Sequence, residues 1–122
     1  MIGHQVFNYL DSFDHYSLFN ISYRKTLKED TILLDIRDDN LLIQTLNKIK
    51  PDIVINCIGV LINVCDKDIK KAIEINTLFP HKLAKFSDEI NAKLIHMSTD
   101  CVFSGRKAKP YKEDDNLSLI HI

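Results

Sequence analysis

Two groups of small or polar residues in this chain follow apolar runs and could bind a ligand directly. Thr99 and Asp100 place a hydroxyl and a carboxylate after the run Lys93–Ser98. Gly59 follows the run Ile53–Ile58, and a ligand can approach the backbone closely there because glycine has no side chain. Taken alone, each group also fits an ordinary turn.

Two charged groups complete the set of candidates. Arg24 and Lys25 follow the predicted strand Tyr16–Tyr23 and could hold a phosphate through charge-assisted hydrogen bonds. Asp35 comes directly after the apolar run Thr31–Leu34. The plainer interpretation is that the two basic residues are solvated and that the acid serves a turn or a helix cap. Neither group identifies a function by itself.

Alternating helix and strand patterns would bring these groups together. Helical spacing of apolar residues predicts one helix from the start of the chain to Phe13 and a second, capped by Asp38 or Asp39, that ends before Lys50-Pro51. A third helical stretch runs from about Asp68 to Ile90, and Pro80 either kinks it or starts a second segment. The expected strands are Tyr16–Tyr23, Thr31–Leu34, Ile53–Ile58 and Lys93–Ser98.

This order predicts a doubly wound α/β fold of the Rossmann type with a parallel sheet. The run Ile53–Ile58 is apolar except for Asn56, which is typical of a strand buried on both faces. We therefore expect Ile53–Cys57 and Leu94–Met97 to be central and buried. In an open parallel sheet, ligands bind beyond the carboxyl ends of the strands, where the candidate groups lie.

The composition gives no sign of a nucleic-acid or membrane partner. The 16 basic and 17 acidic residues give a formal net charge of -1, and no apolar run approaches the roughly 20 residues of a membrane span. The 3 cysteines form no C-x-x-C pair, and the 5 histidines lack metal-ligand spacing. We expect free thiols in a reducing cytoplasm and no metal site.

Several segments together resemble one enzyme family. His96–Gly105 (HMSTDCVFSG) resembles H-x-S-T-D-Y-V-F-D-G, and Pro51–Gly59 (PDIVINCIG) resembles P-D-V-V-I-N-x-x-[AG]. Tyr111–Asp115 (YKEDD) resembles Y-x-E-x-D, and Ile75–Thr77 resembles [IV]-N-[AT]. These are marks of the dTDP-4-dehydrorhamnose reductases, which are extended short-chain dehydrogenases. Cys101 and the Asn-Cys-Ile-Gly segment depart from the usual Tyr and Asn-Ala-Ala-Ala, which loosens the assignment to rhamnose itself.

The resemblance implies a parent protein that transfers a hydride from a nicotinamide cofactor to C4 of a 4-keto-6-deoxy sugar nucleotide, for the synthesis of cell-surface polysaccharide precursors. Thr99 would be catalytic, because it would bind the carbonyl oxygen of the substrate and stabilise its developing charge. Asp100 would contact the substrate, and Asp35 with Ile36 would border the adenine. The residues implied at the cofactor are Ile2, Gly3, Arg24, Asp35, Ile36, Cys57, Ile58, Gly59 and Met97.

The end of the predicted strand Tyr16–Tyr23 favours NADP(H) over NAD(H). Arg24 and Lys25 follow it at once, whereas the nearest acids, Glu29 and Asp30, lie further on. A basic residue at this place can neutralise the extra phosphate of NADP, and an acidic one favours NAD. We expect Arg24 to be the main phosphate contact. The alternative is that it points into solvent and that both cofactors are used.

Both ends of the chain differ from the family pattern, so we expect a partial NAD(P)-binding domain over residues 1–116. Met1-Ile2-Gly3-His4 resembles the end of G-x-x-G-x-[LI]-G, with Gly3 as the last glycine, packing closely where the helix starts. The family's Tyr-x-x-x-Lys pair is absent, and Tyr111 does not replace it because Asp115 stands at the fourth position. The chain alone is thus expected to be inactive. Residues 117–122 do not resemble the family and are expected to be a non-native tail.

Two other interpretations stay open. A related epimerase or dehydratase would keep its cofactor bound through its cycle, although the H-x-S-T-D segment favours the reductase. A non-catalytic regulatory subunit can use the same fold, and an intact Tyr-x-x-x-Lys in the complete gene would argue against it. The parent protein is expected to be cytoplasmic, and a homodimer is compatible with the resemblance.

Overall fold

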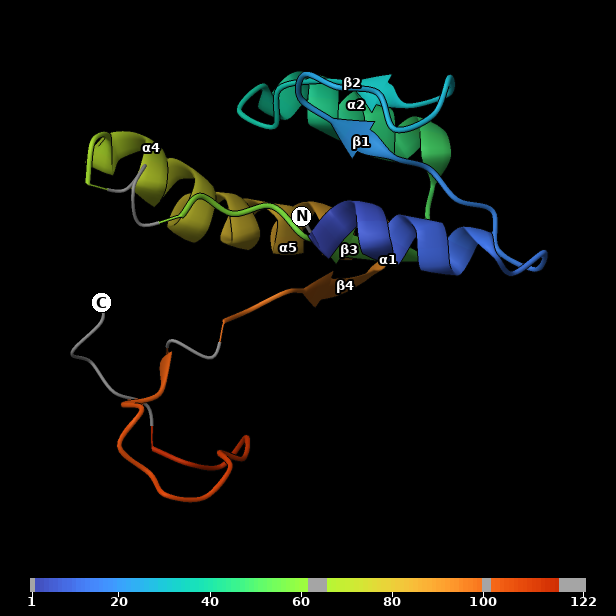
Figure 1. The fold of residues 1–122 in the computed structure, drawn as a ribbon. Helices are drawn as coiled ribbons and strands as arrows, with labels where there is room; N and C mark the ends of the chain where they lie inside the picture. The colour runs from blue at the N-terminus through green and yellow to red at the C-terminus, as the bar shows by residue number, and fades with distance from the viewer. Residues whose placement is uncertain (1, 62–65, 100–101, 117–122) are drawn as a thin grey trace.

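The computed structural model of the chain describes residues 2–61, 66–99 and 102–116 (Figure 1). Helices and strands alternate along them as predicted. In chain order they are α1 (Ile2–Asp11), β1 (Ile21–Ser22), β2 (Ile32–Leu33), α2 (Asp39–Ile49), β3 (Ile53–Asn56), α4 (Ile69–Ile73), the π-helical turn η1 (Glu74–Leu78), α5 (Phe79–Glu89) and β4 (Lys93–His96). The segment 102–116 extends away from these elements (Figure 1).

The described strands pair in parallel, which confirms the predicted direction. β1 pairs with β2 in the register Ile21 to Ile32, and β3 pairs with β4 in the register Ile53 to Lys93. They form 2 two-stranded sheets rather than one continuous sheet. Every strand is shorter than predicted, because only the residues that meet a neighbouring strand form the ladder.

One core nevertheless joins the two sheets. Its buried side chains come from the end of β2, from α2 and from α5, and they are Leu34, Leu42, Leu46, Phe79 and Leu83. Ile21 and Ile32 pack on this core from the first sheet, and Val54 and Leu94 pack on it from the second. The same apolar cluster therefore supports both sheets and the loops at their ends.

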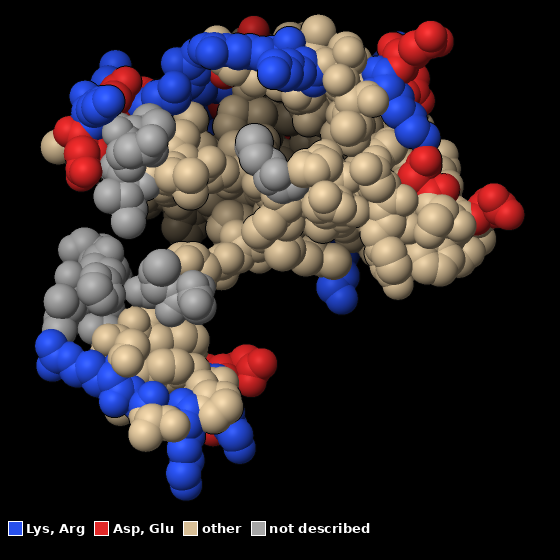
Figure 2. Space-filling view, in the orientation of Figure 1, with Lys and Arg blue, Asp and Glu red and all other residues tan. Residues whose placement is uncertain are grey.

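The expected burial of β3 and β4 on both faces is wrong. Ile53 is 50% exposed, Ile55 36%, Ile95 40% and Met97 40%. Successive side chains of a strand point to opposite faces, so Val54 reaches the core while its two neighbours point the other way. Figure 2 shows few charged residues where α1 and β4 lie, in keeping with an apolar surface on this side.

The ends of α2 follow the predicted signals. Asp38 caps the helix, because its Oδ1 accepts a hydrogen bond from the backbone N–H of Leu41 at 3.0 Å. Lys50 ends it in the left-handed conformation, with φ at 49°, directly before Pro51. The cap marks where α2 begins, and therefore where the loop between Leu33 and Asp39 ends.

Pro80 stands in the first turn of α5, so the second of the two predicted alternatives holds. The π-helical turn η1 precedes it, and there the N–H of Phe79 donates to the carbonyl of Glu74. Proline has no N–H and cannot continue the α-helical bonding pattern of the preceding turn. The wider turn accommodates this break without ending the helical stretch.

Candidate functional site

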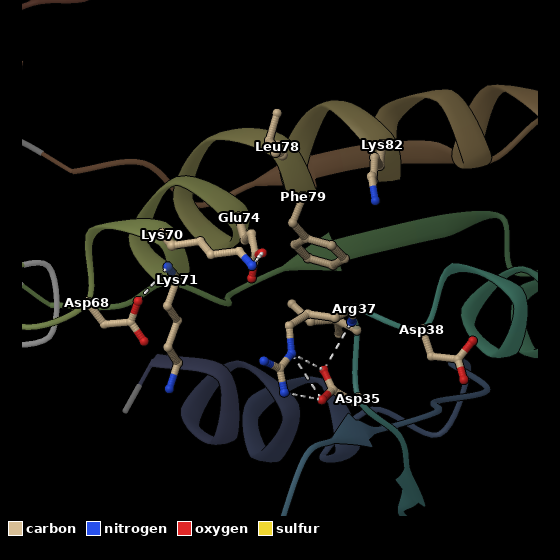
Figure 3. A pocket seen from close by; sticks show the side chains of 11 residues that line it. Asp35, Arg37, Asp38, Asp68, Lys70, Lys71, Glu74, Leu78, Phe79 and Lys82 are labelled. Atoms are coloured by element: carbon tan, nitrogen blue, oxygen red, sulfur yellow. Dashed lines mark hydrogen bonds and ion pairs between the residues drawn. The ribbon is translucent and has the colours of Figure 1, made fainter.

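A cavity of about 810 Å³ lies between the loop that follows β2 and the stretch from α4 to α5 (Figure 3). The β2 loop contributes the residues 35–38, two of which, Asp35 and Ile36, were predicted at the adenine. The helical side contributes charged residues and two apolar ones: Asp68, Lys70, Lys71, Glu74, Leu78, Phe79 and Lys82. The cavity therefore lies between the carboxyl end of β2 and a wall formed by the helical stretch from α4 to α5.

Asp35 does not present a free carboxylate to this cavity. The Nε of Arg37 donates to Asp35 Oδ1 at 3.0 Å, and the backbone N–H of Arg37 donates to the same oxygen at 3.0 Å. The guanidinium also contacts Oδ2 and closes a two-pronged ion pair. These hydrogen bonds hold the pKa of Asp35 below its usual range and raise the pKa of Arg37. Sequence reasoning missed this pair.

Lys71 is the cation of the cavity without an ion-pair partner in the part of the chain that the structure describes. Lys82 pairs with Asp39 at 2.7 Å, and Lys70 lies 3.9 Å from Glu74. Lys71 extends from α4 toward the side that holds Arg37 (Figure 3), and its charge contributes to the low pKa of Asp35. Lys71 is thus a cation of the cavity that a bound anion could engage without breaking an ion pair among the described residues.

Two asparagine side chains hold the loop that follows β3. Asn56 is buried, its Oδ1 accepts from the N–H of Ile58 at 3.0 Å, and its Nδ2 lies 3.0 Å from Nδ1 of His96. Asn76 binds both backbone groups of Val60, accepting from its N–H at 2.9 Å and donating to its carbonyl at 3.0 Å. A single Asn in an apolar strand was the only sequence signal for the first of these contacts.

The start of α1 packs against the same loop. A Cβ placed on Gly3 would lie 3.3 Å from Cβ of Cys57, which is tighter than an ordinary contact. The close packing predicted for this glycine is therefore present. Burial raises the pKa of the Cys57 thiol, so the group stays protonated and acts as a small apolar side chain.

The carboxyl ends of β3 and β4 meet as expected. The N–H of Met97 donates to the carbonyl of Asn56 at 3.0 Å, so the residue lies beside the β3 loop. Thr99 follows on the exposed surface. Asp100, which was predicted to contact the substrate, and the tail at 117–122 lie outside the described residues. Gly3, Cys57 and Met97 are thus brought to one edge.

Arg24 does not line the cavity. Its guanidinium carbon is 4.9 Å from the centre of the Tyr23 ring, an arrangement that a cation–π interaction favours. It is exposed and is not among the residues that line the cavity. The basic residues found at the cavity, Arg37 and Lys71, were not predicted, because nothing in their local sequence marks them.

The segment 102–116 has local structure of its own. The Phe103 and Tyr111 rings stack with their centres 4.5 Å apart, and the hydroxyl of Tyr111 lies 3.1 Å from that of Ser104. This contact, together with the N–H of Lys107, lowers the pKa of Tyr111. Asp115 accepts from the N–H of Lys112 at 2.8 Å. The matching Y-x-E-x-D residues therefore form a compact turn.

The described ranges hold neither a metal cluster nor a membrane-spanning helix. Among residues 2–61, 66–99 and 102–116, no group of His, Cys, Asp and Glu side chains is arranged to hold a metal ion. No helix in these ranges is long and apolar enough to cross a membrane.

Comparison with known proteins gives consistent matches. The family model described as the RmlD substrate binding domain matches residues 13–120. The spore coat polysaccharide biosynthesis protein SpsK of Bacillus subtilis is 35% identical over 86 residues, which cover 70% of this chain and 30% of SpsK. A dTDP-4-dehydrorhamnose reductase of Aggregatibacter actinomycetemcomitans is 29% identical over 89 residues, covering 72% of this chain and 29% of that protein.

A solved structure supports the same relationship. The crystal structure of a hypothetical dTDP-4-dehydrorhamnose reductase from Sulfolobus tokodaii superposes with a TM-score of 0.83 at 26% identity. The match covers 98% of this chain and 43% of that one. The chain spans about 30% of the length of its curated relatives. The predicted Rossmann-type α/β fold is confirmed by this superposition.

Proposed function

The chain belongs to the family of the RmlD substrate binding domain, and from this membership we propose that the complete protein reduces a 4-keto-6-deoxy sugar nucleotide with a nicotinamide cofactor. The observation that carries the proposal is the close approach of Gly3 to Cys57, at the edge where Met97 also lies. It brings a helix N-terminus to the carboxyl ends of two parallel strands, where such folds bind dinucleotides.

The proposed cofactor site fits the described residues. The adenosine end would lie in the cavity beside Asp35 and Ile36, and the pyrophosphate would lie at the start of α1, near Ile2 and Gly3. Cys57, Ile58, Gly59 and Met97 would line the remainder. Among the described residues, a Cβ on Gly59 would meet only the Asn76 Oδ1, at 3.7 Å, which is an ordinary contact distance. When bound, the cofactor supplies the hydride.

We propose NADP(H) rather than NAD(H), with Arg24 as the main phosphate contact. Arg24 is exposed at the end of β1 and has no ion-pair partner among the described residues, so a phosphate could engage it. A charge-assisted contact of this kind contributes about 1.5–3 kcal/mol. That energy is enough to separate the two cofactors by about tenfold or more.

For the substrate, we propose that Thr99 binds the carbonyl oxygen and that Asp100 contacts the sugar nucleotide. The Thr99 hydroxyl would donate to the oxygen as negative charge develops on it during hydride transfer. Support comes from the exposed position of Thr99 after β4 and from the relatives named as dTDP-4-dehydrorhamnose reductases. We infer a cytoplasmic protein for this reaction, with a homodimer as its assembly.

The cofactor part of the proposal is tested by titrating the complete gene product with NADPH and with NADH and following the fluorescence of the reduced nicotinamide. We expect saturable binding of NADPH that is tighter than that of NADH. A folded protein that binds neither would contradict the proposal. Cofactor that stays bound through purification, without net oxidation during turnover, would favour an epimerase or dehydratase instead.

A further inference from the structure

Lys71 lines the cavity from its helical wall and has no ion-pair partner among the described residues. It is partly buried, and its side chain extends from α4 toward the side that holds Asp35 and Arg37 (Figure 3). Its charge adds to the effect of Arg37 in lowering the pKa of Asp35. Removing an ammonium group from water costs free energy unless a partner compensates for it. An anionic group of a ligand in this cavity would be such a partner.

The carboxylates that line the cavity are each engaged by another group of the chain. Asp35 is held in its two-pronged ion pair. Asp38 and Asp68 each accept a hydrogen bond of 3.0 Å from a backbone N–H, at the starts of α2 and α4. Glu74 lies 3.9 Å from the ammonium group of a neighbouring lysine. Because turning any of these acids toward Lys71 would break an existing contact, a bound ligand is the better source of negative charge.

The chemistry of the proposed ligand supplies this charge close to its adenosine group. With the adenosine beside Asp35 and Ile36, the 5′ oxygen of its ribose carries the pyrophosphate of NADH and NADPH, and the 2′ oxygen carries the extra phosphate of NADPH alone. A lysine ammonium is a compact charge with three donors on a flexible stem, and it binds phosphate as a point charge. Lys71 therefore suits a phosphate on either side of the adenosine.

We infer that Lys71 binds a phosphate group of the dinucleotide from the helical wall of the cavity. The inference rests on the proposed function, because the adenosine end must lie in the cavity for a phosphate to reach this side chain. It adds a contact from α4 to those proposed at Arg24 and at the start of α1. No role in cofactor binding was predicted for Lys71 from the sequence.

The test compares Lys71→Met, Lys71→Arg and the control Lys85→Met in the complete gene product. Methionine keeps an unbranched apolar side chain and removes the charge, whereas arginine keeps the charge. Lys85 is exposed on α5 and does not line the cavity. Each variant is titrated with NADPH and with NADH, and its Tm is measured. We expect Lys71→Met to raise the Kd for NADPH about tenfold, Lys71→Arg to stay within about threefold of wild type, and Lys85→Met to bind unchanged.

The titration with NADH identifies which phosphate Lys71 binds. A loss of affinity confined to NADPH supports a contact with the 2′-phosphate, and a similar loss for NADH supports a contact with the pyrophosphate. The salt dependence of binding is a second readout, because salt screens a contact between an ammonium and a phosphate. The Kd of the wild type should therefore rise more steeply with salt than that of Lys71→Met. Lys71→Gln, which also removes the charge, serves if Lys71→Met does not fold.

The outcomes distinguish the two proposals. Wild-type binding of NADPH with unchanged affinity in Lys71→Met overturns the inference and leaves the proposed function intact. Equal losses in Lys71→Met and Lys71→Arg, equal losses in Lys71→Met and Lys85→Met, or the same salt dependence in Lys71→Met and wild type also overturn it. A folded wild-type protein that binds no nicotinamide dinucleotide overturns the proposed function and, with it, the inference.

Discussion

Gly3 in the first turn of α1 packs directly on Cys57, the residue that follows β3, with 3.3 Å between the Cβ of Cys57 and a Cβ placed on the glycine. A helix start and a strand end are thus packed so closely that a side chain on Gly3 would have to push Cys57 aside. Because backbone N–H groups at a helix start are free to bind anions, this junction is where the proposed pyrophosphate would lie.

Filling this junction should destabilise the protein. Gly3→Leu forces a side chain into the Cys57 contact, and overpacking of this kind costs about 1–3 kcal/mol of unfolding free energy. Asn8→Leu is the matched control, because Asn8 is exposed on the same helix. Urea and thermal unfolding followed by circular dichroism measure both variants. A Gly3→Leu protein as stable as the control would show that α1 does not pack in this way.

Gly59→Ala should separate cofactor binding from stability. The new Cβ meets only an ordinary contact at 3.7 Å, so we expect the unfolding free energy to change by less than about 0.5 kcal/mol. If the cofactor approaches the backbone at this residue, the Kd for NADPH rises about tenfold because the methyl group occupies its place.

Gly105→Ala is the contrasting control for Gly59→Ala. Gly105 has a φ of 70°, where a side chain is strained, so alanine should cost about 1 kcal/mol there without affecting NADPH binding. The assignment of Gly59 to the cofactor fails if Gly59→Ala binds NADPH as the wild type does.

Arg24→Ala should lower kcat/KM for NADPH about tenfold or more and spare NADH, because it removes one charge-assisted contact of roughly 1.5–3 kcal/mol. Arg106→Ala, an exposed arginine of the segment 102–116, controls for the loss of one positive charge. Steady-state kinetics with NADPH and with NADH measure kcat/KM for each variant. Equal losses for NADPH and NADH, or none, would remove Arg24 as the selector.

The Asp35–Arg37 pair should make a small, acid-sensitive contribution to stability. Hydrogen bonds from Arg37 lower the pKa of Asp35 in the folded chain. The contribution is therefore fully present above the unfolded carboxyl pKa of about 3.9 and is lost as the pH falls through the lower folded-state pKa. Arg37→Ala should raise the pKa of Asp35 toward its usual value. Titration of the Asp35 carboxyl by NMR measures this, with Lys85→Ala as the control. An unchanged midpoint in Arg37→Ala would show that Arg37 does not lower the pKa of Asp35.

The order and direction of the elements could be predicted because they depend on local periodicity and caps. The Asp38 cap and the stop at Lys50-Pro51 are examples, since both act within one turn of the helix. The exposure of Ile53 and Ile55 could not be predicted, because an apolar run shows which faces are suited to burial and not which faces the described elements cover.

The candidate site, too, could be predicted only in part. The loops after β3 and β4 were expected to meet, and parallel pairing brings them together through Met97 and Asn56. The contacts of Asn76 depend on a side-chain direction set by a π turn, and those of Arg37 on a direction set by a loop. A periodic sequence pattern predicts neither direction. Those two residues were therefore found only in three dimensions.

Hydride transfer by the complete gene product is the measurement that tests the central claim most directly. NADPH and a dTDP-linked 4-keto-6-deoxy sugar are supplied, the loss of NADPH absorbance is followed, and the sugar nucleotide formed is identified by mass. We expect one NADPH oxidised per reduced sugar, a loss of about a hundredfold in kcat for Thr99→Val, and no turnover by the 122-residue chain alone, which has no Tyr-x-x-x-Lys. A folded gene product that binds NADPH but reduces no 4-keto-6-deoxy sugar nucleotide would contradict the account.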